Sequence, residues 1–428
     1  MKRIAKFLLP LTMVALLATA CGQKAENATE TPAPTENKPA QTEMQEITFM
    51  IPDWGAPNEE LLAEFEAQNG IKVNVNTVGW DDIRNKISTA AVGGEAAADV
   101  VEVDWSWAGE FNAADWLEPI DMSAEDIADM PSIAPFMIDN KVLAVPYAND
   151  YRIAYYNKAM FEQAGITTEP KTWDEVVTAA KAIKEKGIAK YPITIPMNAD
   201  ESATTSMIWM ALTRNGVVFN EDGTLNKDSM VDALTFTNQL VKDELIDPAN
   251  QSGSGMDAYR KITAGEAAFM VGPTSFVSRV NDEKESKVIG QVVPILLPGR
   301  TATSEKTYAL PEAVGVLKLS KNKEAAQTFV KWYTSPEIQV KLNETNNTIP
   351  TRNSVLEKLI QDGKIKDSGA MLEQGKLIMS PFTTGIPSYY SEMSNAIYNN
   401  INSMVTGNQS PEQAFDAMDA KIKELLKK

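Results

Sequence analysis

The sequence predicts an α/β protein, because short apolar strand patterns alternate with amphipathic helix patterns along most of the chain. Residues 47–51 have the pattern of a strand, residues 58–69 carry apolar side chains at helical spacing, and residues 71–78 alternate valine with asparagine. A helix over 80–92 and a buried strand over 99–103 follow. This order of strand, helix, strand, helix and strand indicates parallel β-α-β units.

The same alternation continues in the second half of the chain. Thr172 is a predicted N-cap with Glu175 at the capping-box position, and the helix that they open is expected to run to Gly187. Further strands are predicted over 192–196 and 267–271, and further helices over 228–242, 258–264, 323–334, 336–344 and 411–427.

The chain begins with the pattern of a secretion signal. Lys2, Arg3 and Lys6 precede an apolar run over 7–18. This run is shorter than the roughly 20 apolar residues that a membrane-spanning helix needs. We therefore expect a signal peptide over residues 1–20.

A tether is expected after this signal, because residues 22–43 contain no aromatic or branched aliphatic residue and cannot bury enough apolar surface to fold. Ala18-Thr19-Ala20-Cys21 resembles the lipobox of bacterial lipoproteins, although the motif most often has leucine where Ala18 stands. The resemblance implies that Cys21 is acylated with fatty acids such as palmitate and begins a disordered tether over 21–44. A plain signal peptide with a chance cysteine is the alternative.

Several features of the composition exclude whole classes of function. The chain has no histidine, which removes the usual zinc ligand and the base of a Ser-His-Asp triad. Its only cysteine is Cys21, so no disulfide within the chain and no thiol catalysis are expected. The formal net charge of -18 repels nucleic acid. No G-x-G-x-x-G loop occurs either, and neither a cofactor nor a metal is expected. Without histidine or a spare cysteine, any enzyme would have to use carboxylates, lysine or tyrosine.

A family resemblance becomes visible in the middle of the chain. The segments VPYANDYR at 145–152, AYYNK at 154–158, MFEQAG at 160–165 and KTWDE at 171–175 closely resemble the extracellular solute-binding proteins of ABC importers. The resemblance is to the sugar-type branch, the relatives of maltose-binding protein. It covers essentially all of the chain after the tether, because further matching segments follow in the family's order: AGEAAFM at 264–270, SKNKEAA at 320–326, SPE at 335–337, IPTR at 349–352 and GNQSPEQA at 407–414.

The resemblance implies a periplasmic-binding-protein fold, in which two α/β lobes hold the ligand in the cleft between them. Two or three hinge crossings would join the lobes, near residues 150–155, 298–308 and 346–350. Both lobes are then discontinuous in sequence, the first formed by residues 45–152 and 305–347, the second by residues 153–304 and 348–428. Hinge closure around the ligand is the expected motion.

Candidate ligand contacts follow the predicted strands of the first lobe. A sugar presents hydroxyl groups and flat C–H faces, so its cleft needs carboxylates, amides or arginine beside aromatic rings. Asp53 and Trp54 follow the first strand, and Asp104 and Trp105 follow the strand over 99–103. The resemblance places these loops in the cleft. Packing of Trp54 against its own loop is the alternative reading.

Asp150 and Arg152 lie on the first expected hinge crossing. One interpretation is an ion pair that stiffens the hinge. The other is that Asp150 accepts hydrogen bonds from sugar hydroxyls while Arg152 orients it or donates to the ligand. Both can hold together.

The resemblance adds four candidates: Trp209 on a helix that lines the cleft in the family, Phe276 where the family frequently has tryptophan, and Tyr308 with Glu312 where sugar binders commonly have a pair of glycines. Burial of Trp209 in the core is the alternative, since apolar helices more often bury their tryptophan. The replacement of the glycine pair suggests an altered ligand.

The leading functional hypothesis is a lipid-anchored receptor at the outer face of the cell membrane. This receptor would act as a monomer. It would capture a sugar, in the first instance an oligosaccharide, and deliver that sugar to the transmembrane subunits of an ABC permease. One alternative keeps the fold and changes the ligand to a non-sugar solute. The other is an extracellular carbohydrate-cleaving enzyme that uses paired carboxylates such as Asp104 and Asp150.

Overall fold

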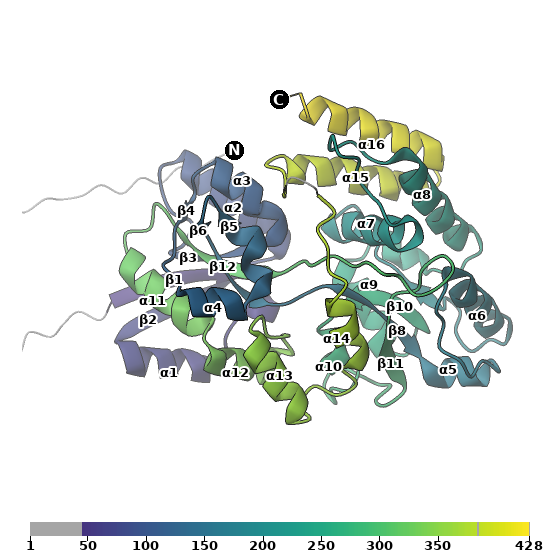
Figure 1. Cartoon of the computed structure of the whole chain (residues 1–428), viewed down its shortest axis with the longest axis horizontal. Coiled ribbons are helices and arrows are strands. Elements are labelled where there is room, and N and C mark those ends of the chain that lie inside the picture. Colours follow the sequence, from purple (N-terminus) through teal and green to yellow (C-terminus); the bar gives the residue numbers. More distant parts are fainter. Residues whose placement is uncertain (1–44, 383–384, 428) are drawn as a thin grey trace, which may run out of the picture. The chain divides into compact units, whose positions relative to one another are not determined.

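The computed structural model describes residues 45–382 and 385–427, which form two α/β lobes, each built on its own sheet (Figure 1). The predicted signal peptide, Cys21 and the tether lie outside the described residues. Among the residues that are described, no helix combines the length and the apolar character needed to cross a bilayer.

The first sheet has the strand order β2-β1-β3-β12-β4. Strands β1 (Gln45–Ile51), β2 (Ile71–Thr77) and β3 (Val100–Asp104) run parallel, which confirms the predicted β-α-β units. Strand β12 (Glu312–Leu317) arrives from late in the chain and pairs antiparallel with β3, so that Glu312 lies opposite Asp104. It also pairs antiparallel with β4 (Leu117–Glu118) and β7 (Val145–Ala148).

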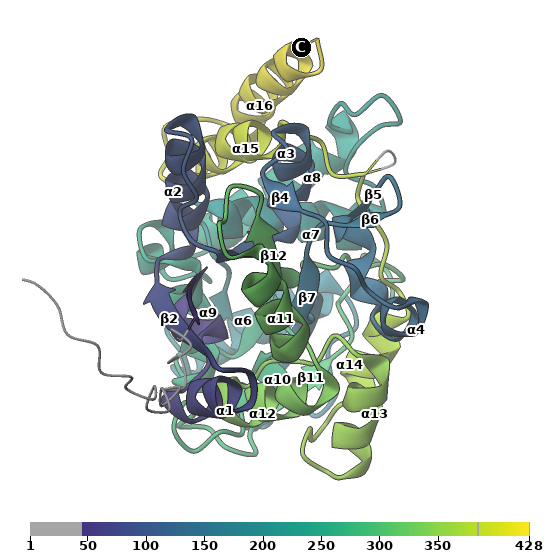
Figure 2. The same ribbon diagram turned by 90° about the vertical axis from the view of Figure 1, so that its left-hand side faces the viewer.

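Helices cover this first sheet and form a hydrophobic core with it. They are α1 (Glu59–Asn69), α2 (Trp80–Val92), α11 (Lys323–Tyr333) and α12 (Pro336–Asn346), and α11 lies over β12 in Figure 2. The ring of Phe329 on α11 meets those of Phe49 and Phe65 edge to face, with centroids 5.0 and 5.2 Å apart. Such aromatic contacts fix the helix on the sheet.

The second sheet has the strand order β11-β8-β10-β9. Strand β8 (Arg152–Asn157) lies antiparallel to β10 (Phe269–Pro273) and to β11 (Val292–Ile295), while the short β9 (Ile193–Thr194) pairs parallel with β10. Every residue of β8 is buried. Helices therefore have to cover both of its faces.

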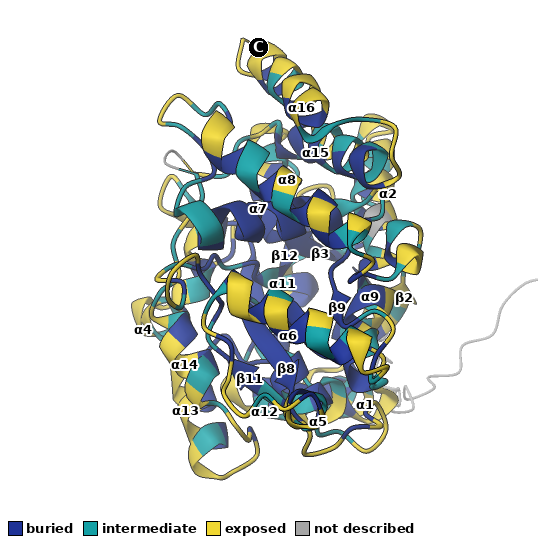
Figure 3. Cartoon of the chain, turned by 90° about the vertical axis from the view of Figure 1, so that its right-hand side faces the viewer, coloured by how far each residue is buried: buried dark blue, intermediate teal, exposed yellow. Residues whose placement is uncertain are grey.

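The helices of the second lobe include α6 (Trp173–Glu185), which turns an exposed face outward and a buried face toward the sheet (Figure 3). The predicted capping box is present, with the Thr172 hydroxyl accepting from the Glu175 amide at 3.2 Å and the Glu175 carboxylate accepting from the Thr172 amide at 3.0 Å. The others are α5 (Lys158–Gln163), α7 (Glu201–Asn215), α8 (Lys227–Lys242), α9 (Gly255–Thr263), α10 (Phe276–Arg279), α13 (Asn353–Gln361), α14 (Gly369–Gly375), α15 (Tyr390–Val405) and α16 (Pro411–Leu425).

Smaller elements complete the first lobe. They are the helices α3 (Ala108–Ala113) and α4 (Ala124–Asp129), and a two-stranded ribbon of β5 (Met137–Ile138) and β6 (Lys141–Val142).

Three chain segments connect elements of the two lobes and lie side by side. The first runs from β7 to β8, the second from β11 to β12, and the third from α12 to α13. The amide of Leu310 donates to the carbonyl of Asp150 at 2.7 Å, and the amide of Asn149 donates to the carbonyl of Ile349 at 2.8 Å. The sequence limits given above for each lobe stay a prediction.

Candidate ligand-binding site

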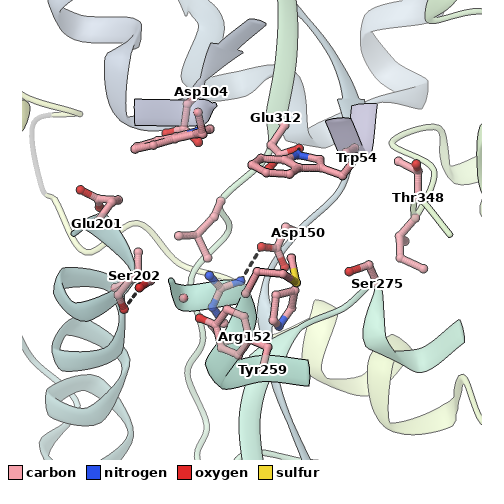
Figure 4. A pocket seen from close by; sticks show the side chains of 18 of the residues that line it. Trp54, Asp104, Asp150, Arg152, Glu201, Ser202, Tyr259, Ser275, Glu312 and Thr348 are labelled. Atoms are coloured by element: carbon pink, nitrogen blue, oxygen red, sulfur yellow. Dashed lines mark hydrogen bonds and ion pairs between the residues drawn. The ribbon is translucent and has the colours of Figure 1, made fainter. Parts of the chain in front are cut away.

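A cavity of about 380 Å³ lies where strand ends of the first lobe face the second lobe. The first lobe contributes Trp54 just after β1, Asp104 at the end of β3 and Glu312 at the start of β12 (Figure 4). The carboxyl ends of parallel strands meet at one edge of a sheet, so the βα loops of β1 and β3 converge here. Since β12 is antiparallel, its first residue reaches the same edge.

Trp54 and Glu312 form one wall of the cavity. The indole N–H of Trp54 donates to Oε2 of Glu312 at 2.7 Å, and the hydroxyl of Tyr147 donates to the same oxygen at 2.9 Å. Burial, followed by repulsion from Asp104, raises the pKa of Glu312 from 4.5 to about 8. The two neutral donors orient the carboxyl group, and neither brings a positive charge to it.

Asp104 ends β3 and caps the 3-10 turn Trp105–Trp107 that follows it. Its Oδ1 accepts from the amide and the hydroxyl of Ser106, at 2.8 and 2.5 Å. Only 6% of Asp104 is exposed, and this burial raises its pKa from 3.8 to about 6 despite the bonds from Ser106. The turn also carries Trp105, which lines the cavity as predicted by its position.

Asp150 and Arg152 lie at the floor of the cavity as an ion pair between Oδ2 and an arginine Nη1 (Figure 4). The other oxygen of Asp150 accepts from the amide of Thr274 at 3.1 Å. The ion pair that the sequence suggested is therefore present, and both of its members also line the cavity.

Glu201 reaches the cavity from the second lobe, as the first residue of α7. The hydroxyl of Tyr390 donates to its Oε1 at 2.5 Å, and the hydroxyl of Ser394 donates to its Oε2. Burial raises its pKa from 4.5 to about 8 against the lowering effect of these donors. Glu201 is not among the residues that the sequence singled out.

Six of the ten predicted contact residues line the cavity: Trp54, Asp104, Trp105, Asp150, Arg152 and Glu312. The other four do not. Asp53 is exposed outside the lining. Trp209 is fully buried and stacks on Trp173 with centroids 5.7 Å apart, so the core interpretation of this residue was the correct one.

Phe276 and Tyr308 are also core residues. The ring of Phe276 is fully buried against Tyr155 and Tyr259, with centroids 6.3 and 6.1 Å away. Tyr308 is fully buried and donates its hydroxyl to the carbonyl of Thr205 at 3.0 Å. Large apolar faces favour burial over cavity exposure at both positions.

The structure adds lining residues that sequence reasoning missed. Trp80, Tyr259 and Arg279 contribute side chains of types that the sequence analysis sought, yet each belongs to a helix and has no strand-end position to single it out. The remaining additions are Ala148, Asn149, Asp200, Glu201, Ser202, Thr205, Ser254, Gly255, Met256, Pro273, Ser275, Leu310, Asn346, Thr348 and Ile349.

Fold and cavity together define a two-lobed binding protein, and comparisons with known proteins agree. The family model for bacterial extracellular solute-binding proteins matches residues 51–340. A binding protein of Brucella abortus is 25% identical over 395 residues, which are 90% of this chain and 94% of that protein. The diacetylchitobiose binding protein of Streptomyces coelicolor is 24% identical over 341 residues, 73% of this chain and 75% of that one.

A solved structure has the same fold. Maltose-bound MalE3 of T. maritima superposes with a TM-score of 0.76 at 24% identity, covering 89% of this chain and 99% of that one. This chain belongs to the family of bacterial extracellular solute-binding proteins.

Proposed function

We propose that this protein is the solute receptor of an ABC importer, which captures a sugar in the cavity between its lobes and delivers it to the membrane permease. One observation carries the proposal: carboxylates and indole rings line the same cavity, with Asp104 and Glu312 beside Trp54 and Trp105. Sugar hydroxyls donate to carboxylate oxygens, and the C–H faces of a sugar ring pack on aromatic rings.

The size of the cavity and one relative support a carbohydrate ligand. A volume of about 380 Å³ falls at the lower end of the range of about 300 to 1,000 Å³ that small-molecule sites occupy, which favours a single sugar or a short oligosaccharide. The relative from Streptomyces coelicolor is named for a disaccharide derivative, diacetylchitobiose.

Binding is favoured over carbohydrate cleavage. A glycosidase needs two carboxyl groups that reach the substrate, one of them able to transfer a proton. Asp150, one member of the pair that the sequence suggested, is engaged by Arg152 at one oxygen and by Thr274 at the other. Those contacts hold Asp150 as a charged carboxylate and do not suit a group that transfers a proton to a substrate.

The proposal includes a lipid anchor at Cys21, which would keep the folded part at the outer face of the cell membrane as a monomeric receptor beside its permease. The sequence Ala18-Thr19-Ala20-Cys21 and the polar composition of residues 22–43 support it. Replacing Cys21 with serine is expected to release the protein from membranes in detergent partitioning, with ligand binding unchanged. Continued fractionation of this variant with membranes would contradict the anchor.

A thermal-shift screen of the purified chain against monosaccharides and oligosaccharides tests the binding function. A ligand that binds only the folded state adds about 2.7 kcal/mol to the free energy of unfolding at a hundredfold excess over Kd. At least one sugar is expected to raise the melting temperature by several degrees, in a concentration-dependent way. Release of reducing ends from an oligosaccharide would instead support cleavage.

A further inference from the structure

The cavity lining carries more acidic side chains than basic ones. Five carboxylates line it, and the only basic side chains in its described lining are Arg152 and Arg279. Both guanidinium groups already have a carboxylate partner. Arg152 pairs with Asp150, and Arg279 pairs at 2.6 Å with Glu285, which lies outside the lining.

The four other carboxylates of the lining belong to Asp104, Asp200, Glu201 and Glu312. Within the described residues, no lysine or arginine lies within 4.0 Å of any of them. Their protein partners are hydroxyl, amide and indole groups, which donate hydrogen bonds but bring no positive charge. Glu312 shows the consequence, since both of its donors contact Oε2 and leave Oε1 without a protein partner.

Asp104 acts electrostatically on two of the other carboxyl groups. The charge of Asp104 raises the pKa of Glu201 in the second lobe and also that of Glu312 in the first lobe. Figure 4 shows these three side chains around the upper part of the cavity. A single positive charge beside Asp104 would therefore relieve the repulsion on both neighbours.

A ligand that would complement these acidic groups is an organic cation, whose positive charge would favour their ionised form. No three acidic side chains among the described residues lie close enough to hold a common metal ion. The lining also presents the rings of Trp54, Trp80 and Trp105. Aromatic faces attract ammonium groups and not only sugar faces, so acids and rings favour one ligand that carries both features.

We propose that the solute is a cationic sugar, an amino sugar or an aminated polyol, whose ammonium group lies beside Asp104 between Glu201 and Glu312 while its ring packs on the indole rings. This inference rests on the proposed sugar-binding function and names the chemical class of its ligand. The hydroxyls of such a ligand would reach Ser275 and Thr348, which line the side of the cavity away from Glu201 (Figure 4).

Titration calorimetry of the purified full chain with matched ligands tests this inference. Glucosamine, glucose and N-acetylglucosamine share one ring and differ in charge, and the galactose and mannose series provide the epimers. Phosphate buffer at pH 7 is used, since Tris is itself an amine. In at least one series we expect the hexosamine to bind ten times more tightly than both neutral analogues, or more.

Variants show whether the carboxylates produce this preference. Asp104→Asn is expected to reduce the preference for the hexosamine to less than threefold, and Glu312→Gln to reduce it in part. Glu221→Gln removes the same kind of charge from an exposed turn outside the lining and should keep the full preference. If Asp104→Asn does not fold, Glu312→Gln carries the test.

The outcomes distinguish the cationic inference from the proposed sugar receptor. Neutral hexoses that bind as tightly as their amines would overturn the cationic inference and leave the sugar receptor intact. Spermidine, a cation without hydroxyls, is included as a probe, and its binding in the absence of any sugar binding would overturn the sugar receptor. Binding of no probe would overturn both.

Discussion

The indole N–H of Trp54 donates to Oε2 of Glu312 at 2.7 Å, which joins two residues separated by 258 positions in the chain. Trp54 belongs to the loop after the first strand, while Glu312 opens the strand that returns to the first lobe near its end in sequence. The hydrogen bond fixes the indole ring relative to the carboxylate. A wall that combines an aromatic ring with a carboxyl group is therefore present before any ligand binds.

Trp54→Phe tests this wall, because the variant keeps an aromatic ring and loses the donor. This bond exists in the ligand-free protein, so its loss acts on binding by leaving the Glu312 carboxyl group less firmly oriented, and the affinity for the sugar ligand is expected to fall in titration calorimetry. The melting temperature should fall slightly, because an intramolecular hydrogen bond contributes about 0.5 to 1.5 kcal/mol and Trp54 is partly exposed. Trp332→Phe, a similar change on α11 outside the cavity, is the control, and equal losses of affinity in both variants would contradict the role of Trp54.

Trp105→Ala is expected to reduce stability as well as affinity. Only 3% of Trp105 is exposed, and its ring meets those of Tyr390 and Tyr308 edge to face at 5.1 and 6.1 Å. Truncation of a buried tryptophan costs about 3 to 5 kcal/mol, which chemical denaturation measures as a lower free energy of unfolding. The sequence alone favours a loss of affinity with little loss of stability, and the contacts of the ring show why both should fall. An unchanged denaturation midpoint would contradict the packing role.

Asp150→Asn tests the ion pair where the chain first crosses between lobes. The variant keeps the shape of the side chain but leaves the buried guanidinium of Arg152 without a carboxylate. Breaking a fully buried ion pair lowers the free energy of unfolding by about 3 to 5 kcal/mol. Because Asp150 is partly exposed, we expect a loss at or below the lower end of this range. Affinity should also fall, because the crossing segment lines the cavity.

Small-angle scattering connects this pair to lobe closure. Ligand should reduce the radius of gyration of the wild type, and a higher ligand concentration should be needed for the same reduction in Asp150→Asn. A ligand shifts the open and closed populations only by its differential affinity for the two states. Tight binding without compaction would show that closure is not coupled to occupancy.

The sequence predicted much of the fold because its signals are local. The capping box of Thr172 with Glu175 and the alternating strands around the first helix depend on neighbours within a few residues, and both are present. Asp104, which lines the cavity, was selected because the end of a strand can be located from the sequence and because the family resemblance placed the following loop in the cleft. Only the resemblance to a known family indicated the two discontinuous lobes.

The rest of the cavity depends on contacts between distant parts of the chain. Glu201 is held by Tyr390, 189 positions away, so nothing beside it in the sequence distinguishes it from an ordinary acidic residue at a helix start. Tyr308 fails as a candidate for the same reason, because the partner that buries its hydroxyl lies 103 positions away. Polar and aromatic side chains near a cleft are assigned to cavity or core by tertiary packing, which a local pattern does not contain.

The last prediction concerns the dependence of stability on pH. Burial raises the pKa of Asp104 to about 6 and those of Glu201 and Glu312 to about 8, and it raises that of Glu102, whose buried oxygens have no hydrogen-bond partner. Between the ordinary carboxyl pKa near 4 and these raised values, the folded state holds more protons than the unfolded state. The contribution of these groups to the free energy of unfolding therefore decreases as pH rises from about 4 to 8.

Glu312→Gln removes one of these groups and should flatten the decrease. The full effect is about 1.4 kcal/mol for each unit of raised pKa, reduced here because Glu312 is partly exposed to the solvent in the cavity. Urea denaturation of the ligand-free chain between pH 5 and 8.5 measures the slope, with Glu221→Gln on an exposed turn as the control. We expect the stability of Glu312→Gln to approach or exceed that of the wild type at pH 8 and to fall below it at pH 5. Parallel curves for the two proteins would mean that Glu312 does not titrate in this range.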